Sequence, residues 1–146
     1  SEILSCAVSD GGTTISFPWA GAAVKAMKEL LLSPIRKIGQ NLQFETCWMH
    51  RMLGAHVNNW FWDDLVATHA LDNRAGVCAL DFRAYADFGF PPWDQAVAPY
   101  ITSKSPAEPN RLKEVPLHQL LLYGGIDALL EYKLAEKQCK EMEVRL

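Results

Sequence analysis

The stretch from Ile38 to Met49 constrains the fold more than any other part of this chain. It begins with the apolar residues of a short buried strand, in which Gly39 allows a neighbouring backbone to approach closely. From Phe44 onward the apolar residues recur at helical spacing, and Gly54 is a typical helix stop. The stretch therefore predicts a strand that runs directly into a helix.

Two polar residues, Asn41 and Glu45, lie at the joint between this strand and helix. Burying polar groups costs free energy unless they are used, and open α/β sheets bind ligands at the carboxyl ends of their strands. One interpretation is therefore a ligand site. The alternative is that Asn41 caps the turn and that Glu45 is a first-turn acid favoured by the helix dipole.

Turn and periodicity signals predict the other elements. The turn Asp10-Gly11-Gly12 separates two short runs that suit an antiparallel hairpin. The C-terminal region is one long helix or two helices broken at Gly124-Gly125, and its charged end from Glu131 is expected to be solvated or to point toward a following domain. Strands are predicted over 2–9, 13–17 and 57–62, helices over 22–32, 65–71, 79–88 and 117–142, and a long irregular segment over 91–110.

This order of elements predicts a mixed α/β sheet flanked by helices, in a single domain over residues 1–146. A net charge of −3 argues against a protein that holds nucleic acid mainly by bulk positive charge. No apolar run is long enough to cross a membrane. The 4 cysteines form no CxxC pair, which predicts reduced thiols in a cytosolic protein.

A second polar group lies in the C-terminal helix, where Tyr123 and Asp127 share one apolar face at i and i+4. The pair could be a buried tyrosine that bonds an acid. Together with Glu45, however, it predicts carboxylates gathered from different elements, which suit Mg²⁺ or Mn²⁺. Two such ions about 4 Å apart can stabilise phosphodiester hydrolysis, and a tyrosine there could orient the attacking water.

These segments together resemble a known family. The segment from Gly39 to Glu45 resembles the second motif of DEDD-type 3′–5′ exonucleases, especially the proofreading domains of family A DNA polymerases. The segment from Tyr123 to Asp127 resembles their third motif in its DEDDy form. Residues 62–67 resemble the family's strand-to-helix segment, and residues 10–19 resemble its second and third strands. The resemblance spans roughly residues 2–138.

The resemblance implies a ribonuclease H-like fold and two-metal removal of nucleotides from a 3′ end. The implied substrate is single-stranded DNA, and the implied setting is a DNA polymerase with its own polymerase domain, in a bacterial or phage-infected cytoplasm. The implied roles are metal binding and catalysis for Asp127 and Glu45, positioning of the water for Tyr123, contact with the terminal nucleotide for Asn41 and Phe44, and a structural or supporting role for Asp63.

The chain departs from the family pattern in two ways. Glu45 stands where most members have aspartate, and the first motif, Asp-x-Glu on the central first strand, is absent. The expectation is an N-terminally truncated domain that binds metal poorly alone, unless a second copy or another polypeptide supplies the strand. Three alternatives remain: a catalytically dead module that binds or supports, an RNA-processing exonuclease of the same fold, and an unrelated α/β protein.

Overall fold

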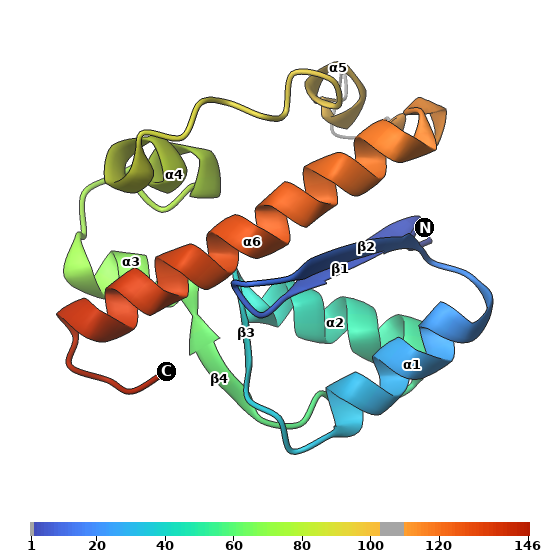
Figure 1. Cartoon of the computed structure of the whole chain (residues 1–146), viewed down its shortest axis with the longest axis horizontal. Helices are drawn as coiled ribbons and strands as arrows, with labels where there is room; N and C mark the ends of the chain where they lie inside the picture. The colour runs from blue at the N-terminus through green and yellow to red at the C-terminus, as the bar shows by residue number, and fades with distance from the viewer. Residues whose placement is uncertain (1, 103–109) are drawn as a thin grey trace.

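A tight turn joins the first two strands, β1 (Ser5–Ser9) and β2 (Thr14–Pro18), into an antiparallel hairpin. This is a computed structural model, which describes residues 2–102 and 110–146 (Figure 1). The Asp10 Oδ1 atom accepts hydrogen bonds from the backbone N–H groups of Gly12 and Thr13 at 2.9 and 2.7 Å. The predicted hairpin is therefore confirmed, and an Asx-type turn sets its register.

The chain then alternates between helices and short strands, as the periodicity predicts. Strand β3 is parallel to β4, and each of the two joins directly to a helix. The elements are α1 (Gly21–Leu32), β3 (Lys37–Gly39), α2 (Leu42–Leu53), β4 (Trp60–Asp63), α3 (Asp64–Leu71), α4 (Leu80–Phe88), α5 (Ala98–Ile101), the short 3₁₀ helix η1 (Leu112–Glu114) and α6 (Leu117–Glu141).

The described strands form two separate two-stranded sheets rather than one continuous sheet. The mixed α/β class is confirmed, because one sheet is antiparallel and the other parallel, with helices around both. Within the described residues, β1 pairs only with β2 and β3 only with β4, so each of these strands has one edge without a strand partner.

Helix α6 is the element that connects these parts. It packs on β1, β2 and β3, and also on α3 and α4 (Figure 1). It is continuous, so the alternative of two helices broken at Gly124-Gly125 is wrong. The two glycines face the hairpin: a methyl group on Gly125 would lie 3.6 Å from the Ser16 Cβ, and one on Gly124 would lie 3.9 Å from the Ala7 Cβ, both ordinary van der Waals contacts.

The C-terminal half of α6 is not the solvated segment that its charges predict. Leu134, Ala135 and Cys139 are buried there. Gln138 is also buried, and its side chain accepts from the Trp62 indole at 2.9 Å. One helix face therefore docks on β4 and α3, while the charged residues occupy the other faces. None of the helices in the described ranges has the length and apolar character that crossing a membrane requires.

The predicted irregular segment over 91–110 is only partly irregular. It contains α5, which begins just after Val97, a residue with 0% exposure that packs with Val115 and Leu120. The Asp94 carbonyl accepts from the N–H groups of Val97 and Ala98 at 2.8 and 2.7 Å, which starts this turn of helix. Residues 103–109 of the predicted segment lie outside the described residues.

The Asp63 carboxylate joins the two strand-to-helix connections. It caps α3 by accepting from the N–H groups of Leu65 and Val66 at 3.0 and 3.3 Å. It also accepts from the N–H groups of Asn41 and Leu42 at 3.0 and 2.9 Å, at the start of α2. One side chain therefore satisfies four backbone donors that the ends of two helices would otherwise leave unpaired.

We expect Asp63→Ala to lower the free energy of unfolding by about 1–4 kcal/mol, because it removes one cap from each of two helices and each cap contributes roughly 0.5–2 kcal/mol. Urea unfolding followed by circular dichroism measures the change. Asp10→Ala, which removes a carboxylate with two backbone donors in an exposed turn, is the matched control. Equal losses in the two variants would contradict the special role of Asp63.

Candidate functional site

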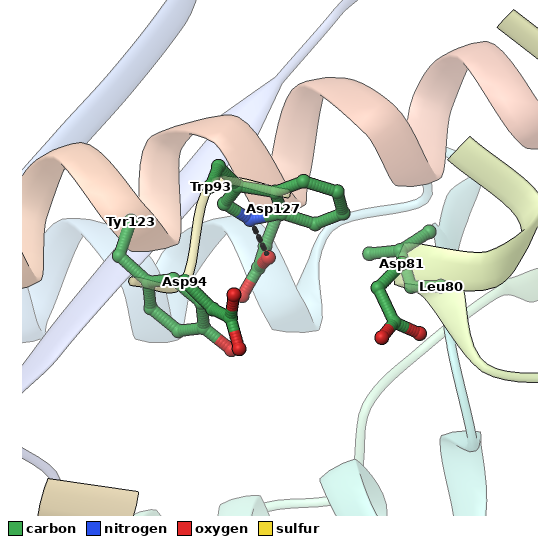
Figure 2. Close-up of a pocket in the computed structure, with 6 residues that line it drawn as sticks. All are labelled: Leu80, Asp81, Trp93, Asp94, Tyr123 and Asp127. Carbon is green, nitrogen blue, oxygen red and sulfur yellow. Dashed lines mark hydrogen bonds between the residues drawn. The ribbon is translucent and has the colours of Figure 1, made fainter. Parts of the chain in front are cut away.

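Tyr123 and Asp127 lie one turn apart on α6, on the side that faces a pocket of about 250 Å³ (Figure 2). The pocket is lined by these two residues together with Leu80, Asp81, Trp93 and Asp94. Three of the six lining side chains are carboxylates, and none is basic. The surroundings therefore favour a cationic ligand, or a ligand that arrives with cations, over a bare anion.

The indole of Trp93 holds the Asp127 carboxylate. Its Nε1–H donates to Asp127 Oδ1 at 2.7 Å, the bond drawn in Figure 2. Burial raises the pKa of Asp127 to about 6, although the hydrogen bonds from Trp93 and Tyr123 oppose that rise. Burial also raises the pKa of Tyr123, with the Asp127 carboxylate as the next contribution. At neutral pH the site therefore holds a carboxylate beside a neutral phenol.

Glu131 is the residue that the sequence analysis missed. It continues the row Tyr123–Asp127–Glu131 at i, i+4 and i+8 on α6 and is not part of a solvated end, so that prediction is wrong for it. Burial and, to a smaller extent, the carboxylates of Asp127, Glu45 and Asp63 together raise the pKa of Glu131 to about 8. The continued four-residue spacing is the signal that could have identified it.

Glu45, in the first turn of α2, lies close enough to Glu131 to affect its titration. Burial raises the pKa of Glu45, and its charge contributes to the raised pKa values of Glu131 and Cys6. The carboxylates of Glu45 and Asp127 therefore both act on Glu131. The described residues contain no group of three or more histidine, cysteine or acidic side chains positioned to hold a metal ion.

The two predicted nucleotide contacts lie at the surface beside Glu45. Asn41 has a left-handed backbone with φ 61°, and its side chain does not cap α2, so the alternative that it caps the turn is wrong. Phe44 is 56% exposed, and its ring packs edge-on against the Trp48 ring, with ring centres 6.2 Å apart. Both side chains are accessible to a ligand, and Phe44 offers an aromatic face on which a base can stack.

Asp64 is a second buried acid that the sequence did not single out. It has 0% exposure, and neither carboxylate oxygen has a hydrogen-bond partner among the described residues. Burial, followed by the charges of Glu131 and Asp63, raises the pKa of Asp64 to about 9. Asp64 is therefore protonated at neutral pH, and the neutral form costs less free energy to bury than the carboxylate would.

Comparisons with known proteins do not identify a family for this chain. No family model matches the sequence, and no curated protein matches it significantly.

The raised pKa of Glu131 makes stability depend on pH. A carboxyl group whose pKa rises from 4.5 when unfolded to about 8 when folded favours the folded state fully below pH 4.5. This contribution is lost as the pH rises to about 8, since Glu131 of the folded state must then ionise near the carboxylates of Asp127, Glu45 and Asp63.

We therefore expect Glu131→Gln to raise the free energy of unfolding of the chain at pH 8 by at least about 1 kcal/mol relative to wild type, since one pKa unit is worth about 1.4 kcal/mol. At pH 5 the two proteins should be closely similar. Urea titrations at both pH values measure this, with the exposed Glu136→Gln on the same helix as the control. A gain that is the same at both pH values would show that charge on Glu131 is not the cause.

Proposed function

We propose that this chain is a 3′–5′ exonuclease domain of the DEDDy type, which acts on the 3′ end of single-stranded DNA within a DNA polymerase. The observation that carries the proposal is the row of Tyr123 and Asp127 on α6, which faces an acidic pocket while Glu45 approaches the same row from α2. These are the residues that the motif resemblance assigns to metal binding and to the water.

The arrangement of strands supports a ribonuclease H-like fold. One antiparallel pair and one parallel pair both pack against α6. Strands β1 and β3 each lack a partner on one edge within the described ranges. A single strand between β1 and β3 would join the four strands into one mixed sheet, and the missing Asp-x-Glu motif is expected on that strand. A longer form of the chain, a second copy or another polypeptide could supply it.

The donor chemistry fits Mg²⁺ or Mn²⁺, since Glu45, Asp127 and Glu131 offer hard carboxylate oxygens. The raised pKa of Glu131 also fits, because a cation would remove the mutual repulsion that now favours its protonation. When bound, the metal ions would stabilise negative charge on the phosphodiester. Asp127 and Glu45 would hold them, Tyr123 would orient the water, and Phe44 and Asn41 would contact the last nucleotide.

A second candidate function is a catalytically dead module that binds a ligand or supports another domain. The observation that bears on it is the exposed Phe44 side chain, a surface for binding that needs no catalytic group. Such a module would keep the fold and the accessible Phe44 surface without hydrolysis. An RNA-processing exonuclease is the third candidate, and the same degradation assay with an RNA oligonucleotide distinguishes it.

We expect Asp127→Ala to lower the exonuclease rate by at least about 10²-fold, because removing one group that stabilises transition-state charge costs about 10²–10³-fold. The assay follows a 5′-labelled single-stranded DNA in Mg²⁺ and Mn²⁺, for a longer chain that includes an upstream Asp-x-Glu strand. Glu136→Ala on the exposed face of α6 is the matched control and should retain activity. Unchanged activity in Asp127→Ala would rule out the assigned site.

We also expect Mn²⁺ to raise the melting temperature of the chain, because a ligand that binds only the folded state stabilises it by mass action. Paired Asp127→Asn and Glu45→Gln substitutions should abolish the rise, and Mn²⁺ should have little effect on that variant. The dead module is favoured if Mn²⁺ leaves the wild-type melting temperature unchanged both in this 146-residue chain and in a longer chain with an upstream Asp-x-Glu strand.

A further inference from the structure

The segment that links α4 to α5 contributes a side chain to the row on α6. We propose that Trp93 is the positioning residue of Asp127: its indole N–H fixes the direction of the Asp127 carboxylate, which also accepts from the Tyr123 hydroxyl, at the edge of the pocket. The positioning of Asp127 by Trp93 does not depend on the proposed function. Only the identity of the ligand that Asp127 binds, a metal ion, rests on that proposal. The sequence gives no hint of the pair, because the two residues are 34 positions apart.

The first argument is the geometry of the bond. An indole offers a single donor in the plane of a rigid ring. Here Nε1–H meets Asp127 Oδ1 at 2.7 Å, the short distance typical of a charge-assisted hydrogen bond (Figure 2). Carboxylates that bind cations are commonly oriented in this way by a neighbouring donor, whose loss costs about 10–100-fold in metal affinity or activity.

The second argument is that the segment holding Trp93 is itself fixed at both ends. Before it, Gly89 closes α4 in a left-handed conformation with φ 64°. Phe90 then packs edge-on against the Trp93 ring, with ring centres 5.6 Å apart. After it, Val97 is fully buried. Pro91 and Pro92 restrict the backbone in between. The indole is therefore held in place, as a positioning group must be.

The third argument comes from the other tryptophans. Trp60 donates its indole N–H to Thr46 Oγ1 at 3.1 Å, and Trp62 donates to Gln138 Oε1 at 2.9 Å. Both of these acceptors are neutral side chains that join elements of the fold. Trp93 instead donates to an acid that lines the pocket, so its bond acts on a group that a ligand in the pocket can reach.

The test compares Trp93→Phe, which keeps an aromatic ring and loses the N–H, with Trp60→Phe, which loses an indole bond elsewhere. In the full chain, side-chain couplings of Asp127 measured by NMR report its χ1 rotamer. We expect one rotamer in the wild type and in Trp60→Phe, and averaging over several in Trp93→Phe. The Trp93 indole N–H signal should also move in Asp127→Ala, while that of Trp60 stays in place.

A single Asp127 rotamer in Trp93→Phe, or an indole signal that does not move in Asp127→Ala, would overturn the proposal. Trp93→His, which can restore an N–H donor, should recover part of the ordering. Mn²⁺ alone is then titrated into both proteins: the midpoint of line broadening at Asp127 should rise about 10–100-fold in Trp93→Phe. If Asp127 is ordered by Trp93 but Mn²⁺ broadens neither protein, with or without an upstream Asp-x-Glu strand, the proposed exonuclease function fails and the positioning role stands.

Discussion

The Asp63 carboxylate is the interaction on which the arrangement around the candidate site depends. It accepts four backbone N–H groups from the beginnings of α2 and α3, and its own residue ends β4 beside Gly39 of β3. The first turn of α2, which carries Glu45, is therefore held next to the parallel strand pair. Because a helix beginning carries unpaired donors, one acid shared by two helices orients both with respect to the same sheet edge.

The site lies where three independently held parts of the chain meet. Helix α2 carries Glu45, helix α6 carries Tyr123, Asp127 and Glu131, and the segment before α5 carries Trp93. The charges of Asp127 and Glu45 both raise the pKa of Glu131, and the described residues place no basic side chain among the six that line the pocket. Like charges held close together without a compensating charge cost free energy. This cost is the physical argument that the acids of the site bind either a cation or a proton.

Local signals predicted the elements well and their assembly less well. The Asp10-Gly11-Gly12 turn, the Gly54 and Gly89 helix ends and the four-residue spacing of Tyr123 and Asp127 all act over a few residues, and the structure has them. Glu131 was missed because its charged neighbours outweighed its position in the row. Trp93, Asp64 and α5 depend on contacts with distant residues, as in the burial of Val97, and no periodicity in the sequence reports such contacts.

The glycine pair in α6 has a consequence for how the protein folds. Glycine inside a helix costs roughly 1 kcal/mol relative to alanine, so the middle of α6 has a weak intrinsic tendency to form. Its stabilising partners, Ala7 and Ser16, lie more than 100 residues earlier in the chain. The helix is therefore expected to consolidate late, once the hairpin is in place, and contacts of such long sequence separation slow the rate-limiting step.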